Sequence, residues 1–99
     1  MMAKAHEPIT PGEILLTEFL EPLGITQYRL AQATGLSQTR ISEIVRGKRA
    51  ITAQTALRLS KALGVDDRFW INIQADYEIE IERDRHGNEL DAVTALVAS

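Results

Sequence analysis

The 99 residues have an ordinary globular composition, with 44% hydrophobic and 25% charged residues, and a chain of this length usually folds as one domain. The absence of cysteine excludes disulfides, thiolate zinc sites and a cysteine nucleophile, and the apolar runs are far shorter than the roughly 18 residues of a membrane span, so we expect a cytoplasmic protein with no membrane contact. Taken as an average, the net charge of −3 disfavours nucleic acid as a partner.

Residues 1–9 carry no useful periodicity and are predicted to form a loose arm before the first helix. The segment Thr10–Glu13 holds a hydroxyl residue, a proline and a glutamate in the order typical of a helix start. Pro22 and Gly24 are predicted to stop this helix. Its apolar stripe at helical spacing consists of Leu16, Phe19, Leu20 and Leu23.

Residues 27–46 have the pattern of two short helices around one tight turn. Thr26 caps the first, which runs over Gln27–Thr34, and Ser37 caps the second, which Gly47 ends. A helix-turn-helix needs a small residue where the helices touch, a turn residue that tolerates left-handed backbone, and apolar residues that lock the second helix over the first. The chain has all of these: Ala31, Gly35, Leu30, Leu36, Ile41, Ile44 and Val45. A plain αα-hairpin in a small bundle is the alternative.

Two further helices complete an all-α fold of five helices. Thr52 caps a fourth helix that Gly64 ends, and Asp66 with Asp67 begins a fifth, where acidic residues suit the positive end of the helix dipole. The fifth helix carries an apolar stripe that is predicted to be core or, between two copies, a dimer interface. The stripe consists of Phe69, Trp70, Ile73 and Tyr77.

The end of the chain has an ambiguous pattern. The segment Ile79–Glu82 alternates with period two and His86–Asn88 is turn-like, so a short strand and hairpin is one possibility. We favour a helix that continues to about Asp84, which gives a domain over residues 10–84. Residues 85–99 are then an extension of uncertain structure, in which a short helical stripe is possible from Val93, Leu96 and Val97.

The sequence resembles a known family in several segments. The helix-turn-helix at 27–46, followed by Arg46-Gly47-Lys48, resembles the phage-repressor (Xre) class. The segments similar to HigA-type (VapI-like) antitoxins are Pro11–Leu15, Gly35–Ser37, Ile51–Ala53, Ala56–Leu59 and Phe69–Gln74. The resemblance covers about residues 8 to 80. It implies a five-helix, lambda-repressor-like DNA-binding domain, and a homodimer that represses its own operon and neutralises a companion RelE-like ribonuclease toxin.

Positive charge is concentrated in the middle of the chain. From residue 27 to 49 five cations face Glu43 alone, and Arg58 and Lys61 follow, whereas from Asp66 onward three arginines face nine carboxylates. The major groove admits one α-helix, whose N-terminal residues reach base edges. The predicted base contacts are Gln38, Thr39, Arg40, Ser42 and Glu43. The predicted phosphate contacts, from a helix N-terminus and a cationic loop, are Gln27, Tyr28, Arg46, Lys48 and Arg49.

Two of these assignments have a simpler alternative. Phosphates repel a carboxylate, so Glu43 is equally well explained by solvation or by a pair with an arginine. A run of cations such as the one at 46–49 is often only a solvated surface, although its place directly after a recognition helix favours phosphate contact.

Other functions are weaker hypotheses. The acidic run Asp76–Asp84 suits either a small basic toxin or a solvated face, so a protein-binding module with little DNA affinity is one alternative, and a stand-alone Xre-type regulator is another. An enzyme is disfavoured, because His6 and His86 have no second ligand at a metal spacing and no glycine loop suited to phosphate is present. We expect no metal or cofactor, and we expect operator DNA, a second copy of the chain and a toxin as partners.

Overall fold

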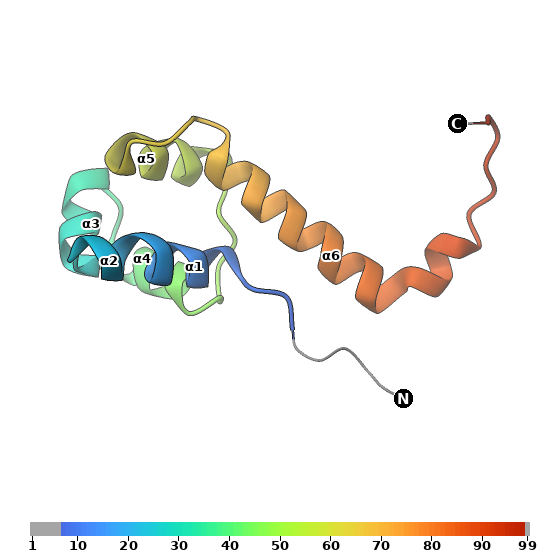
Figure 1. Cartoon of the computed structure of the whole chain (residues 1–99), viewed down its shortest axis with the longest axis horizontal. Helices are drawn as coiled ribbons and strands as arrows, with labels where there is room; N and C mark the ends of the chain where they lie inside the picture. The colour runs from blue at the N-terminus through green and yellow to red at the C-terminus, as the bar shows by residue number, and fades with distance from the viewer. Residues whose placement is uncertain (1–6, 99) are drawn as a thin grey trace.

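In the computed structural model the described residues are 7–98, so positions 1–6 of the predicted arm lie outside them. Pro8 is buried, which means that the chain packs onto the domain before the predicted boundary at Thr10. The described residues contain helices and no strand, which confirms the all-α fold. Figure 1 shows the elements in chain order: α1 (Pro11–Ile14), the π-helical η1 (Leu15–Leu20), α2 (Glu21–Leu23), α3 (Gln27–Thr34), α4 (Gln38–Val45), α5 (Ala53–Leu63) and α6 (Phe69–Asp91).

The elements α1, η1 and α2 form one continuous helical rod, so the described part contains five helical rods, as predicted. The predicted stop at Pro22 and Gly24 is confirmed, since the rod ends at Leu23 with Gly24 as its cap at φ 66°, and Pro22 itself lies inside the last turn. In the wider π turn the Glu21 N–H donates to the Leu16 carbonyl five residues back, and this widening relieves the clash that a proline ring makes inside an α-helix. Leu23, predicted on the buried stripe, is 61% exposed.

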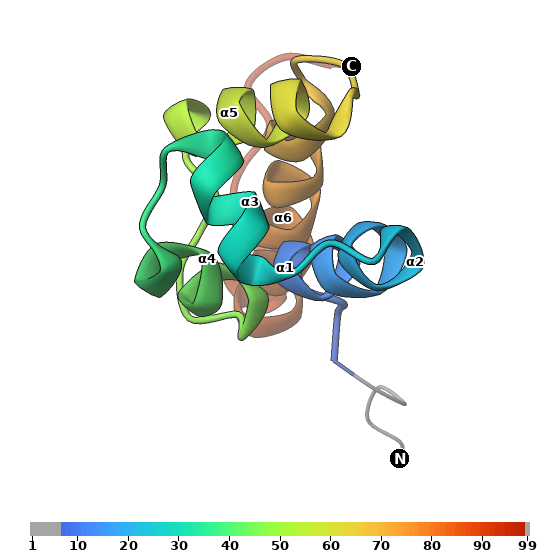
Figure 2. The ribbon, with the colours of Figure 1, turned by 90° about the vertical axis from the view of Figure 1, so that its left-hand side faces the viewer.

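The helix-turn-helix has the predicted boundaries. The Thr26 hydroxyl oxygen accepts a hydrogen bond from the Arg29 N–H at 3.0 Å, and Ser37 caps α4 in the same way. Gly35 takes the left-handed conformation, with φ 76°. Five of the small and locking residues are buried, whereas Val45, predicted on the same buried face, is only half-buried: the five are Leu30, Ala31, Leu36, Ile41 and Ile44. In Figure 2, α3 passes between α5 and α4, and α6 lies behind them.

A glycine in the first turn of α1 sets how closely α1 approaches α4. A Cβ atom on Gly12 would lie 1.6 Å from the backbone carbonyl oxygen of Ile44, a distance that no side chain tolerates. The backbone of the first rod is therefore in direct contact with the C-terminal end of α4. In the sequence, Gly12 is recognisable only as part of a helix start.

An aromatic cluster joins the first rod to α6. The ring centroids of Phe19 and Trp70 are 5.1 Å apart, and Phe69 stands edge-on to both at 5.7 and 5.0 Å. Trp70 is 0% exposed within a single chain, so of its two predicted places the core is confirmed and the dimer interface is wrong. The spacing of the stripe did not reveal this, because a core and a dimer interface use the same helical spacing.

The helix α6 begins later than predicted and consists of two helical segments joined at a kink. It starts at Phe69, after the Asp66 carboxylate accepts from the Arg68 N–H, and it runs to Asp91 with a kink at His86. The hairpin alternative is wrong. The predicted helix to about Asp84 agrees with the break in helical geometry at His86 (φ −131°, ψ 26°), after which a further helical segment continues to Asp91. The possible helix in 93–97 is also wrong, because residues 92–98 are not helical.

The far end of α6 extends away from the other helices (Figure 1). The Cα radius of gyration is 16.4 Å, against about 13 Å for a compact chain of this length. Over the described residues, no helix is both long enough and apolar enough to cross a membrane.

Candidate nucleic-acid interface

The helix α4 has one buried face and one face open to solvent. Ile41 and Ile44 are 0% and 1% exposed, because they pack into the core below the helix. The predicted base contacts lie on the remaining surface: Gln38 and Thr39 are exposed, and Arg40, Ser42 and Glu43 are half-buried. A helix held in this way can insert its N-terminal polar residues into a groove without disturbing the core.

The N-termini of α3 and α4 meet at a shallow hollow. Its lining is polar and consists of Gln27, Gln38, Thr39, Ser42 and Arg46. The Arg46 Nε donates to the Ser42 Oγ at 3.3 Å, which holds a guanidinium at the rim. The first-turn amides of α3 at Gln27 and Tyr28 have no carbonyl of their own helix to bond, so they suit an anion. Residues predicted to contact bases (Gln38, Thr39 and Ser42) and residues predicted to contact phosphates (Gln27 and Arg46) therefore line the same hollow.

Two residues that were assigned to different roles form an ion pair. The Arg49 Nε lies 2.7 Å from the Glu43 Oε1, and their side chains are 46% and 30% exposed. The carboxylate is thus engaged on α4 rather than presented to a base, as the pairing alternative for Glu43 predicted. The guanidinium has further N–H groups besides the one that bonds Glu43, and these could donate to an anion. Nearby, Lys48 is exposed in the same loop.

The helix-turn-helix family HTH_3 matches residues 16–70, more than half of the chain. The chain belongs to this family. It is 37% identical to antitoxin HigA-1 of Vibrio cholerae over all 99 residues, which cover 93% of that protein. It is 47% identical to virulence-associated protein I of Dichelobacter nodosus over 78% of the chain and 72% of that protein.

A solved structure places the chain more closely within the family. The antitoxin HigA of Pseudomonas aeruginosa, solved with the higBA promoter, superposes with a TM-score of 0.85 and is 34% identical, over 92% of this chain and 100% of that one. The five-helix arrangement is therefore that of HigA-type antitoxins. The resemblance to the HigA-type and VapI-like group is confirmed.

This HigA-type chain has a second polar hollow beside α4 that sequence analysis missed. Arg40 and Arg49 line it together with the N-terminal end of α5, where Thr52 and Gln54 lie. The Thr52 hydroxyl oxygen accepts from the Thr55 N–H at 3.4 Å as the cap of α5. The sequence contains a signal for this hollow: a capped helix that follows a cationic loop places free backbone amides beside positive charge.

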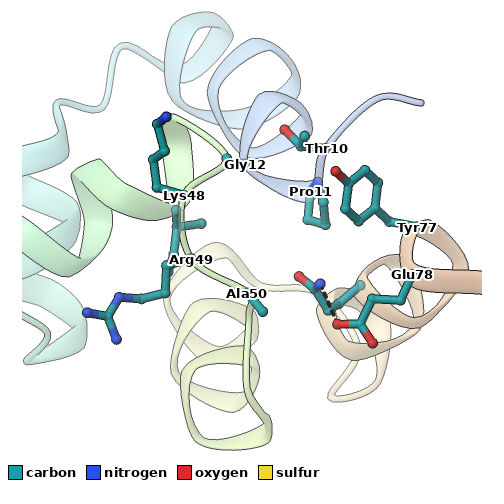
Figure 3. Close-up of a pocket in the computed structure, with 11 residues that line it drawn as sticks. Thr10, Pro11, Gly12, Lys48, Arg49, Ala50, Tyr77 and Glu78 are labelled. Carbon is teal, nitrogen blue, oxygen red and sulfur yellow. Dashed lines mark hydrogen bonds between the residues drawn. The ribbon is translucent and has the colours of Figure 1, made fainter. Parts of the chain in front are cut away.

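A further missed residue ties α6 to the chain that follows α4. Gln74 is 7% exposed, and its Oε1 accepts from the Ile51 N–H at 2.9 Å while its Nε2 donates to Glu78 at 2.8 Å. The junction lines an open pocket of about 230 Å³ (Figure 3). Figure 3 shows the Lys48 and Arg49 side chains extending away from α6. A lone amide within an apolar helical stripe was the sequence signal for this buried polar contact.

The predicted dimer residues other than Trp70 retain some surface. Phe69, Ile73 and Tyr77 are half-buried. Ile73 and Tyr77 also line a groove beside Ile9, which is 56% exposed. These side chains are grouped on one side of α6 near the N-terminal segment, so a partially apolar surface exists where a dimer contact was predicted.

Proposed function

We propose that this HigA-type chain is a sequence-specific DNA-binding repressor and that α4 reads base edges in the major groove. The observation that carries the proposal is the exposure of Gln38 and Thr39 at the start of a helix whose opposite face is buried. A glutamine amide bonds adenine with two hydrogen bonds, and a threonine methyl packs on the methyl of thymine. Arg40 and Ser42 extend the reading surface, and Arg40 is suited to guanine or to a phosphate.

Phosphate contacts flank α4 on both sides in this proposal. The α3 N-terminus, with Gln27, Tyr28 and Arg46, takes one stretch of backbone, and Lys48, Arg49 and the α5 N-terminus take another. Contacts of this kind carry no sequence information but set the register of the recognition helix on the duplex. The concentration of cations in this part of an otherwise acidic chain supports the assignment.

The binding unit is a homodimer. One helix-turn-helix of this size contacts few base pairs, so two copies that read half-sites about 34 Å apart are expected on physical grounds. The surface beside Ile73 and Tyr77 lies on α6 and not on α4, which leaves the recognition helix open. The structure of the antitoxin HigA of Pseudomonas aeruginosa with the higBA promoter supports promoter DNA as the ligand of such a dimer.

The proposal includes an antitoxin role, in which the protein represses its own operon and neutralises a RelE-like ribonuclease toxin. Family membership supports this role. A ribonuclease must itself be basic to hold RNA, and the exposed acidic run Asp76–Asp84 offers such a protein opposite charge.

The DNA proposal is tested by titrating the protein against a fluorescent duplex from the region upstream of its own gene and against a scrambled duplex at one fixed salt concentration. We expect a ratio of affinities of about 10³ or more, the range of specific DNA-binding proteins. Equal affinity for the two duplexes would contradict a repressor of its own operon. In that case, selection from a random pool of duplexes is the next measurement. A selected sequence would mean that the operator lies elsewhere, and no selected sequence would mean that specific binding is absent.

The toxin proposal has a separate test. The product of the neighbouring gene is purified and assayed for cleavage of RNA with and without an equal amount of this protein. We expect cleavage to be suppressed near equimolar ratio. Uninhibited cleavage, or a neighbour without ribonuclease activity, favours the stand-alone regulator.

A further inference from the structure

Arg58, on α5, reaches across to the turn of the helix-turn-helix. Its Nη1 donates to the backbone carbonyl oxygen of Thr34 at 2.7 Å, a contact between residues 24 positions apart. Thr34 is the last residue of α3, and the carbonyls of a final turn lack donors within their own helix. A guanidinium at this end also compensates the negative pole of the helix dipole. Arg58 therefore completes the C-terminus of α3 from a different element.

The side chain of Thr34 takes part in a short hydrogen-bond network that continues toward α4. The Thr34 hydroxyl, which is buried, donates to the Leu30 carbonyl at 2.7 Å and accepts from the Leu36 N–H at 3.3 Å. Leu36 is itself buried, and the next residue caps α4. A Cβ on Gly35 would lie 3.0 Å from the Arg58 Nη1, so the absence of a side chain there leaves room for the guanidinium. Arg58 thus contacts the turn that sets the angle between α3 and α4.

The surroundings of Arg58 separate it from the proposed DNA surface. It lines a hollow with Ala33, Thr34, Lys61 and Ala62. No residue of this hollow lines either of the two hollows beside α4. Its positive charge is therefore directed at the turn and not at the surface on which phosphates are proposed to lie.

We propose that Arg58 is a positioning residue for base reading: it braces the turn between α3 and α4, and so fixes the orientation of α4, without contacting DNA. The inference rests on the proposed function. Base edges are read by hydrogen bonds that tolerate errors of only about 0.5 Å, so loss of a brace affects specific binding far more than binding to phosphates. Sequence analysis counted Arg58 only as one more cation.

The test compares Arg58→Met with Lys61→Met. Both variants remove one cation from α5 beside the same hollow, but Lys61 makes no hydrogen bond among the described residues. Methionine keeps an unbranched stem in place of the arginine stem. Affinities for a duplex selected by the wild-type protein and for a scrambled duplex are measured over a range of salt concentrations, under conditions in which urea unfolding shows each variant to be folded.

For Arg58→Met we expect affinity for the selected duplex to fall about tenfold, while affinity for the scrambled duplex and the salt dependence match those of Lys61→Met. Arg58→Lys keeps the charge but lacks the planar fork, so we expect about a threefold loss confined to the selected duplex. This variant decides the question alone if Arg58→Met does not fold. Wild-type affinity of Arg58→Lys for both duplexes, or a salt slope flattened by about one as in a phosphate contact, overturns the proposal.

Amide hydrogen exchange distinguishes failure of this inference from failure of the proposed function. If the wild-type protein selects no duplex, the repressor proposal fails, but the brace is still measurable. Faster exchange at Gly35 and Leu36 in Arg58→Met than in Lys61→Met supports a braced turn. Equal exchange in the two variants overturns it.

Discussion

The helix-turn-helix and the far half of α6, which is residues 82–91, are both helical, but different interactions stabilise their helices. In the motif, α3 and α4 have eight residues each, each begins with a side-chain cap, and the interior residues are at most 9% exposed. From Glu82 to Ala98 none of the described residues is buried. The motif is therefore specified by tertiary packing together with local signals, and the end of α6 by local signals alone.

This difference explains why Ile79–Glu82 is helical although its sequence pattern allowed either a strand or a helix. The alternation in Ile79–Glu82 suits a strand with one covered face, but a strand needs a partner for its backbone groups and a two-stranded hairpin is marginal alone. A helix satisfies most of its backbone hydrogen bonds within itself. Without a sheet or core to cover this segment, continuation of α6 is the remaining way to pair its backbone.

The contrast predicts opposite effects for the same substitution at two glycines. We expect Gly12→Ala to lower the free energy of unfolding by about 3 kcal/mol or more, because the new methyl group must displace the backbone at Ile44. Gly87, in the far half of α6, has no atom within 4 Å of a Cβ position. We expect Gly87→Ala to stabilise the protein by up to about 1 kcal/mol through helix propensity.

Urea unfolding of both variants, followed by circular dichroism, measures these effects. A Gly12→Ala variant within about 1 kcal/mol of the wild-type protein would mean that α1 can move away from α4 at little cost. A destabilised Gly87→Ala variant would mean that the far half of α6 has a conformational requirement at its kink.

The sequence predicts the parts of the fold that depend on neighbours in the chain. The caps, the turn glycine and the locking residues lie at short, fixed spacing, and both helices of the motif have the expected ends. The contacts of Arg58 and Gln74 span 24 and 23 positions, and no local pattern specifies which backbone group such a side chain will meet. The π turn before Pro22 is a third kind of feature, because spacing does not show where a helix widens and lets a proline fit inside its last turn.

For the candidate site, sequence analysis predicted which residues point outward but not how they pair. The buried positions of Ile41 and Ile44 determine the exposed face of α4, so Gln38 and Thr39 could be assigned from spacing alone. The pair between Glu43 and Arg49 depends on how the loop after α4 turns back, which spacing does not specify.

A substitution at the junction of α6 with the domain tests where packing ends along that helix. We expect Gln74→Leu to lower the free energy of unfolding by about 2 kcal/mol, because the buried Ile51 N–H loses its acceptor. Gln32→Leu is the matched control, since Gln32 is exposed and bonds only the Tyr28 hydroxyl among the described residues, and we expect a change within about 0.5 kcal/mol. Equal urea midpoints for the two variants would show that the buried bond contributes nothing net.

A binding measurement tests the proposed contrast in function between the two regions. We expect Gln38→Ala to weaken binding to the selected duplex about tenfold and to relax the base preference at one position, because one bidentate contact is lost. Asn88→Ala removes an exposed amide from the far half of α6 and is expected to leave affinity unchanged. If Gln38→Ala binds matched and mismatched duplexes as the wild-type protein does, Gln38 does not contact bases.

The smallest effect is expected from removing the non-helical end of the chain. Ending the protein after Asp91 deletes residues that are exposed throughout their described part, including Val93, Leu96 and Val97 at 71%, 93% and 80%. Since little apolar area leaves water here on folding, we expect the free energy of unfolding to change by less than about 0.5 kcal/mol. A loss of more than about 1 kcal/mol in urea unfolding would show that these aliphatic side chains are covered in solution, and concentration dependence of that loss would identify a second copy of the chain as the cover.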